Sequence, residues 1–154
     1  MKTSQVTKDF WTGVSDPKLA ELKRSILERE NGRRFPVDLS FVEPRPEAER
    51  YRGRVHVLVE RFSYSNAAVV AAMVQDYKFG VIVGETTADL PSTYGAAHQF
   101  SLPNTKLAVV YPKALMIRPS GEISISGVRP DREVADDVFT TRDEILEKAL
   151  ELVR

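Results

Sequence analysis

Hydrophobic and polar positions along the chain predict helices and strands in alternation. Between Asp16, a suitable N-cap, and Gly32, a suitable helix end, apolar residues recur at helical spacing. Pro17 occupies the first helical position, which favours a helix start. The apolar face consists of Leu19, Leu22, Ile26 and Leu27. This segment is therefore expected to form an amphipathic helix that packs against another part of the protein.

The centre of the chain predicts a strand, a helix and a second strand. Residues 55–59 are almost continuously apolar, which is typical of a strand covered on both faces. A helix rich in alanine follows Ser65 and ends near residues 78–80, and a buried strand follows at residues 81–84. This order predicts a right-handed parallel crossover in an α/β fold. The polar loop 85–95 then follows a strand end, where open α/β sheets place their sites.

The remaining segments predict a hairpin and a final helix. Residues 97–102 and 107–111 have strand character and are joined by the turn-forming segment 103–106. A turn at 117–122 precedes a short strand that ends at residues 128–131, and the charged, proline-containing segment 42–50 predicts an extended connector. Thr141 and Glu144 have the spacing of a capping box for a helix. Its apolar stripe would be Ile145, Leu146, Ala149, Leu150 and Val153.

Composition narrows the classes of function. The chain has 154 residues, 42% of them hydrophobic, which predicts a single domain. Its formal net charge is +0, so it lacks the basic surface that binding of nucleic acid requires. It contains no apolar run of the roughly 20 residues that a membrane helix needs, and no signal-peptide core at its N-terminus. The chain has no cysteine and two histidines that are far apart in the sequence, so no metal site is expected. No glycine-rich phosphate loop is visible, so no cofactor is expected. A chain without cysteine fits either an oxidising or a reducing compartment, so its cellular location stays open.

Ser65 stands where the first central strand gives way to the helix. A hydroxyl at such a turn is lifted out of the sheet, and the free N–H groups of the helix can stabilise an oxyanion. The simpler interpretation is an N-cap serine, and Ser63 in the same turn is a second candidate nucleophile. A serine also needs a general base to remove its proton. The sequence therefore predicts a candidate nucleophile and leaves its base to be found.

With these segments in place, the chain resembles the C-terminal half of the catalytic domain of the tail-specific, or C-terminal-processing, serine peptidases. The resemblance covers roughly residues 50–153. It rests on the order of the segments 55–68, Gln75-Asp-Tyr, Ile82-Val-Gly-Glu-Thr-Thr, Leu102-Pro-Asn, Tyr111-Pro-Lys, Arg118-Pro-Ser-Gly and Gly127-Val-Arg-Pro-Asp.

The resemblance implies a fold and an activity. The fold would be a partial domain of the crotonase and Clp-peptidase type, built from stacked β-β-α units, with residues 1–50 as an N-terminal helix and connector and residues 51–154 as the catalytic part. Peptide bonds of a polypeptide substrate would be hydrolysed through an acyl-enzyme on Ser65. Asn66 would donate an oxyanion-hole N–H.

The chain departs from the family pattern at the base. Leu90 stands where many members carry a general-base lysine, and no histidine precedes His56, although the tricorn-like branch uses an early one. The family segment Asp-x-Arg-x-Asn-x-Gly-Gly, which supplies a strand and a second oxyanion donor, is also absent. We therefore expect the chain to be part of a longer protein. The alternatives are an inactive module that binds a peptide or an apolar ligand, and a domain that assembles into a homo-oligomer.

Five further residues are candidates for the site. His98 is a candidate base, although a core histidine explains it as well, and Glu85 is either a site carboxylate or an ordinary strand-end residue. Glu122 lies about where the tricorn-like branch places its glutamate. Thr93 and Tyr94 would line the substrate groove, or belong to an ordinary loop.

Overall fold

A computed structural model of the chain describes residues 1–38 and 43–153, and these form two compact units. The first unit comprises Met1–Pro44 and Tyr94–Leu115, and the second comprises Arg45–Thr93 and Met116–Arg154. Helices and strands occur in both, which confirms the predicted mixture of helix and strand. No helix in the described ranges is long and apolar enough to cross a membrane.

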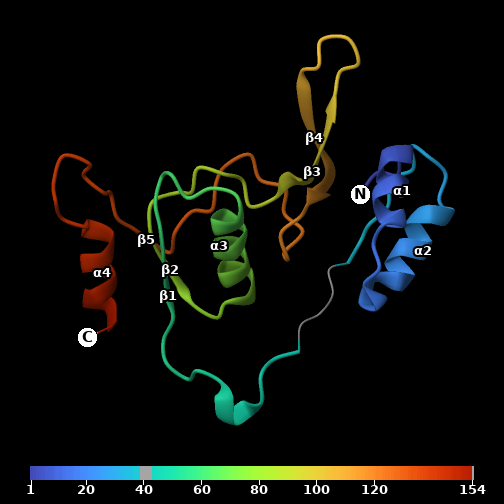
Figure 1. Cartoon of the computed structure of the whole chain (residues 1–154). Helices are drawn as coiled ribbons and strands as arrows, with labels where there is room; N and C mark the ends of the chain where they lie inside the picture. The colour runs from blue at the N-terminus through green and yellow to red at the C-terminus, as the bar shows by residue number, and fades with distance from the viewer. Residues whose placement is uncertain (39–42, 154) are drawn as a thin grey trace. The chain divides into compact units, whose positions relative to one another are not determined.

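The second unit is built on a three-stranded parallel sheet (Figure 1). Its strands are β1 (His56–Val59), β2 (Val81–Gly84) and β5 (Arg132–Glu133), in the order β1-β2-β5. The helix α3 (Asn66–Tyr77) connects β1 to β2, and Leu58 lies opposite Val83 in the parallel register. The predicted strand, helix and strand are therefore confirmed, with bounds within one or two residues of those expected.

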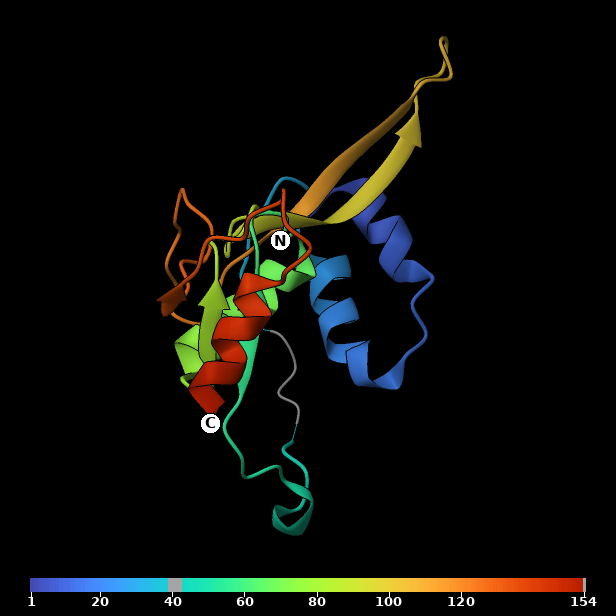
Figure 2. The ribbon, with the colours of Figure 1, turned by 90° about the vertical axis from the view of Figure 1, so that its left-hand side faces the viewer.

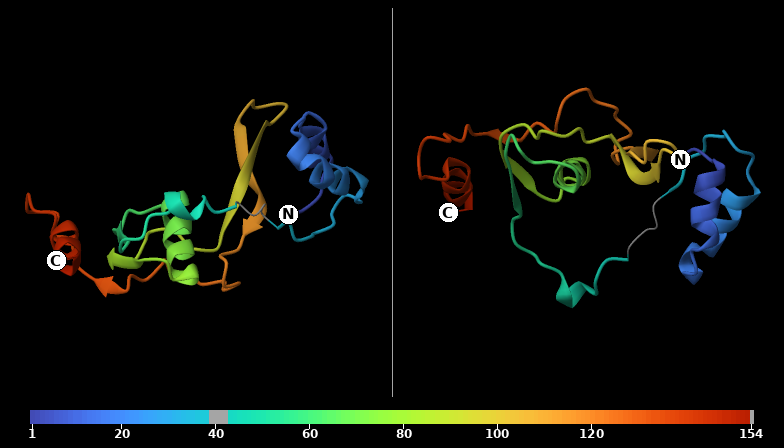
Figure 3. Two further views of the ribbon diagram at one scale, coloured as in Figure 1. Left: turned by 90° about the horizontal axis from the view of Figure 1, so that it is seen from below. Right: turned by 45° about the horizontal axis from the view of Figure 1, so that its top comes forward.

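Two helices cover opposite faces of this sheet. Figures 1 and 3 show α3 on one side of β1 and β2 and α4 (Glu144–Val153) on the other. Ala71 and Ala72 of α3, 0% and 1% exposed, pack against Val59 and Ile82. Small side chains allow this close approach of helix and sheet because they place little volume between the two backbones. The strand residues alternate between the two faces.

The expectation that β1 is covered on both faces is wrong at one position. Leu58 is 41% exposed, whereas the neighbouring Val59 is 3% exposed. The helix α4 contacts both β1 and β2, and its residues Ile145 and Ala149 bury Val83, while Leu58 stays partly uncovered. Figure 2 looks onto α4 with this sheet behind it.

The start of α4 differs from the predicted capping box. The Leu146 N–H donates to Oδ1 of Asp143 at 2.8 Å, so Asp143 caps the helix rather than Thr141. Asp143 directly precedes the helix and its short carboxylate reaches the free N–H groups of the first turn. The predicted apolar stripe is only half covered, because Leu146, Leu150 and Val153 are between 43% and 47% exposed.

The predicted short strand before residues 128–131 is absent from the described residues. Residues 121–131 have no regular structure, and β5 follows at Arg132–Glu133 instead. Within the described part of the chain, the segment makes a single backbone contact with the loop after β2, in which Thr87 N–H donates to Val128 O at 3.2 Å, whereas the bond from Val134 N–H to Gly84 O at 2.8 Å belongs to the pairing of β5 with β2. The alternating apolar side chains of the predicted strand are not buried, because Ile123 is 63% and Ile125 98% exposed, and burial begins only at Val128, which is 1% exposed.

The first unit contains a helix that the sequence pattern did not indicate. This helix, α1 (Gln5–Thr12), begins at Ser4, whose hydroxyl accepts the Thr7 N–H at 3.2 Å. The predicted helix is present as α2 (Ala20–Glu28), preceded by a 3₁₀ turn at Pro17–Leu19 that Asp16 caps. Trp11, Ile26 and Phe35 form the core between these elements. Figure 3 shows α1 and α2 side by side.

The predicted hairpin is also present in this unit. Its strands are β3 (Thr93–Ser101) and β4 (Ala108–Met116), both longer than expected. Across the turn, Leu102 N–H donates to Leu107 O at 2.9 Å. The connector contains a 3₁₀ turn at Glu47–Glu49, while Val42 lies outside the described residues.

Candidate active site

The backbone of Ser65 has an uncommon conformation. Ser65 is the N-cap of α3 with φ 55° and ψ −122°, and its side chain accepts no capping hydrogen bond. A non-glycine residue in this region is strained and persists only where its surroundings hold it there. The side chain of Ser65 is exposed. A sharp strand-to-helix turn with an exposed hydroxyl is the geometry of a nucleophile elbow.

Ser63 lies in the same turn and has a different environment. Its hydroxyl accepts the Glu60 N–H at 3.0 Å, and its own N–H donates to Glu60 O at 2.9 Å. Ser63 is half-buried, while Ser65 is exposed. The Ser63 side chain therefore closes the turn, which favours Ser65 over Ser63 as the nucleophile.

Two main-chain N–H groups lie at the start of the elbow helix, and one of them is occupied. The Ser65 N–H donates to Oδ2 of Asp89 at 3.0 Å. In the described residues the Asn66 N–H has no acceptor, as is usual for the first residue of a helix. The Asn66 N–H, next in the chain to Ser65, is thus a donor that can still bind an oxygen atom.

The loop after β2 is hydrogen-bonded to the elbow. The N–H groups of Ala88 and Asp89 both donate to Ser63 O, at 3.0 and 3.3 Å. Leu90, the next residue of this loop, is half-buried and donates its N–H to Asp89 Oδ1 at 2.8 Å. The loop therefore supports the elbow through its backbone and through Asp89, and its side chain at position 90 has no basic group.

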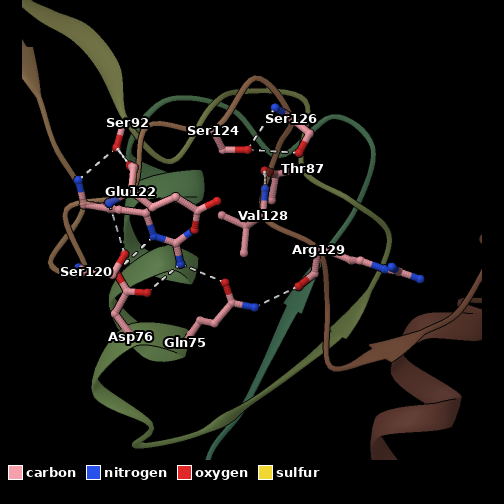
Figure 4. A network of polar contacts seen from close by, with 11 residues as sticks. Gln75, Asp76, Thr87, Ser92, Ser120, Glu122, Ser124, Ser126, Val128 and Arg129 are labelled. Carbon is pink, nitrogen blue, oxygen red and sulfur yellow. Dashed lines mark hydrogen bonds and ion pairs between the residues drawn. The ribbon is translucent and has the colours of Figure 1, made fainter.

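A buried ion pair joins the far end of α3 to the segment after β4 (Figure 4). Arg118 donates to both carboxylate oxygens of Asp76, at 2.6 and 3.0 Å, and to Gln75 Oε1 at 2.8 Å. The two charged side chains are 6% and 9% exposed. These hydrogen bonds from Arg118 hold the pKa of the Asp76 carboxyl below its ordinary value. Ser120 N–H also donates to Asp76 at 2.9 Å, so the carboxylate closes this turn.

The same network continues towards the loop after β2. Gln75 Nε2 donates to Arg129 O at 3.0 Å, and Val128 N–H donates to the Thr87 hydroxyl at 2.8 Å (Figure 4). An added Cβ at Gly127 would lie 1.9 Å from Thr87 O, so only glycine allows this approach. The three sequence elements around Gln75, Arg118 and Gly127 are thus joined by contacts that stabilise the unit.

Glu85 is held by an arginine from the turn after β1. Arg61 donates to Glu85 Oε1 at 2.6 Å and to Oε2 at 2.7 Å, and the Asp136 N–H donates to Oε1 at 3.3 Å. These hydrogen bonds, above all those from the Arg61 side chain, lower the pKa of Glu85. A carboxylate that is kept ionised and paired in this way fits a structural role better than that of a proton acceptor.

The remaining candidates are distributed over both units. His98 and Tyr94 belong to the first unit, where His98 packs edge-on against Tyr111 with ring centroids 5.7 Å apart. Thr93 and Glu122 belong to the second unit with Ser65. The Ser92 hydroxyl donates to Glu122 O at 2.6 Å, and the Glu122 side chain is 62% exposed. Asp89 was not among the candidates, and its position two residues before Pro91 in a polar loop carries no periodic signal that singles it out.

A strained and exposed serine at a strand-to-helix turn is typical of serine hydrolases. Residues 14–134 match the family model described as peptidase family S41, and the chain belongs to this family, that of the tail-specific proteases. This membership makes it a serine peptidase domain and indicates a polypeptide substrate. None of the curated proteins compared with the chain matches it.

Proposed function

We propose that the domain hydrolyses peptide bonds through an acyl-enzyme on Ser65, with the Asn66 N–H as an oxyanion donor. The observation that carries this proposal is the backbone of Ser65, which is strained at φ 55° while its hydroxyl is exposed and free of a capping bond. An ordinary N-cap serine accepts an N–H of the first turn and has extended backbone angles. Ser65 does neither, so capping does not explain the residue.

The general base is the part of this mechanism that the elbow does not contain. A serine hydroxyl needs a base within hydrogen-bond reach, either directly or through one water. The carboxylate that contacts the elbow, Asp89, accepts main-chain N–H groups, and Leu90 replaces the family lysine. We therefore propose that a segment outside residues 1–154 supplies the base, and His98 is the alternative within these residues.

Three further properties that the family resemblance implies belong to the same proposal. They are the division into an N-terminal segment 1–50 and a catalytic part 51–154, stacked β-β-α units of the crotonase and Clp-peptidase type, and processing of polypeptide C-termini. The three-layer arrangement of α3, the sheet and α4 supports the fold assignment. The half-covered stripe of α4 is compatible with assembly of several copies.

A fluorophosphonate probe tests the nucleophile directly. The probe is applied to this chain and to the longest natural form that contains it, and the adduct is located by peptide mass spectrometry. We expect an adduct on Ser65, which Ser65→Ala abolishes and Ser63→Ala leaves in place. An adduct on Ser63, or hydrolysis that survives Ser65→Ala, would refute the assignment.

One observation favours a second function. The lysine position is occupied by Leu90, and binding energy alone does not replace a base. A module that retains the fold and holds an extended peptide without cleaving it would fit this substitution. Saturable binding of a fluorescent peptide, without any adduct or hydrolysis in either form of the protein, would favour this second function.

A further inference from the structure

The Asp89 carboxylate bridges the loop after β2 and the elbow. Oδ2 accepts the Ser65 N–H at 3.0 Å, while Oδ1 accepts the Leu90 N–H at 2.8 Å. The backbone of Asp89 is itself fixed, because its N–H donates to Ser63 O at 3.3 Å and its carbonyl accepts the Thr87 hydroxyl at 2.9 Å. The carboxylate is thus anchored on the loop side and contacts the elbow at its strained residue.

We propose that Asp89 is a positioning residue that holds Ser65 at φ 55° and thereby aims its hydroxyl. The role in catalysis rests on the function proposed for Ser65. A hydrogen bond from a main-chain N–H to an ionised carboxylate is stronger than one to a neutral acceptor. A strained residue reverts to a relaxed conformation unless such contacts determine its backbone angles. The bond to Asp89 fixes the peptide plane that precedes Ser65, which is the plane whose rotation changes φ.

The chemistry of the side chain explains why an aspartate suits this position. Its two oxygens each accept one N–H group, from Ser65 and from Leu90. Asparagine has one acceptor oxygen, and its amide nitrogen would face the second N–H group. Asp89→Asn should therefore keep one of the two hydrogen bonds, and Asp89→Ala should keep neither.

The negative charge of Asp89 lies beside the N–H groups that would bind an oxyanion. A charge in this position opposes the charge that develops on the substrate oxygen. Positioning and charge therefore predict opposite effects of Asp89→Asn on the reactivity of Ser65. A slower reaction indicates that positioning dominates, and a faster reaction indicates that the charge dominates.

The first measurement follows main-chain amides and needs no activity. Amide hydrogen exchange and ¹H shifts of ¹⁵N-labelled protein are recorded for the wild type, Asp89→Asn and Asp89→Ala. Asp137→Ala is the matched control, because Oδ1 of Asp137 likewise accepts a local main-chain N–H, from Phe139 at 3.0 Å. We expect exchange at Ser65 to accelerate at least tenfold in Asp89→Ala, less in Asp89→Asn, and not in the control. Unchanged exchange and shift at Ser65 in Asp89→Ala would overturn the proposal.

The second measurement is the rate at which the fluorophosphonate modifies Ser65 in the same variants, made in the longest natural form that contains the chain. We expect the order wild type, Asp89→Asn, Asp89→Ala, with the last at least tenfold slower than the first. A faster reaction of Asp89→Asn than of the wild type, or an unchanged rate in Asp89→Ala, would overturn the positioning role. If the wild type does not react even in the longest natural form, the function proposed for Ser65 fails, while the amide measurement still decides whether Asp89 holds the elbow. Amide shifts remote from residue 89 show that each variant is folded.

Discussion

The strain at Ser65 should be measurable as a difference in stability between two substitutions. In the described residues the Ser65 side chain makes no hydrogen bond and is exposed, so Ser65→Ala should leave the free energy of unfolding almost unchanged. A non-glycine residue in a sparsely populated region costs about 1–3 kcal/mol. Glycine removes this cost because it has no Cβ, but it loses about 0.5–1 kcal/mol in chain entropy. Ser65→Gly should therefore be more stable than Ser65→Ala by about 1 kcal/mol.

Urea unfolding followed by circular dichroism at 222 nm measures this difference, provided that both variants share one m value. Val70 supplies the control, because it lies on the exposed side of the same helix, at 50% exposure, with ordinary helical backbone. At Val70 glycine should be less stable than alanine by about 1 kcal/mol, so the sign of the difference is reversed. If glycine is also the less stable residue at position 65, Ser65 does not adopt the strained conformation, and the argument for the elbow is refuted.

Three further predictions concern the contacts that support the elbow. Asp76→Asn should lower the free energy of unfolding at pH 7 by about 3 kcal/mol, because the buried Arg118 guanidinium loses its buried counter-ion and keeps only the exposed Glu122 carboxylate at 3.7 Å. Since the pKa of Asp76 is lowered in the folded state, the wild type should lose this contribution as the pH falls below about 3.8. Urea unfolding between pH 2 and pH 7 would show the loss. Gly127→Ala should reduce the thermal midpoint far more than Gly13→Ala, because the added Cβ would lie 1.9 Å from Thr87 O at position 127 and 3.5 Å from its nearest atom at position 13. Equal midpoints of the two variants would contradict the close approach of Gly127 to Thr87. Ser63→Ala should cost about 1 kcal/mol in urea unfolding through the lost turn bond, and no cost would exclude that bond.

The sequence by itself determined the local elements around the elbow. The apolar run 55–59, the alanine-rich helix and the strand 81–84 carry their own periodicity and boundaries, so β1, α3 and β2 could be predicted closely. Ser65 could be named as a candidate nucleophile from its place at the strand-to-helix junction and from the family resemblance of the segments around it, because both are local properties of the sequence. The helix α1 was missed because eight residues offer a short pattern, and its start depends on a single serine cap.

Only the tertiary structure decided which residues support the site. Asp89 is 24 residues from Ser65, Arg118 is 42 residues from Asp76, and each pair meets only when the chain has folded. Hydrogen bonds between distant residues leave no periodic trace in a sequence, whereas burial on one face of a helix or strand does. Likewise, the need for glycine at position 127 follows only from the folded chain, in which the Thr87 carbonyl lies too close for a side chain. The proposed nucleophile is thus a local feature of the sequence, and its support is a product of the folded chain.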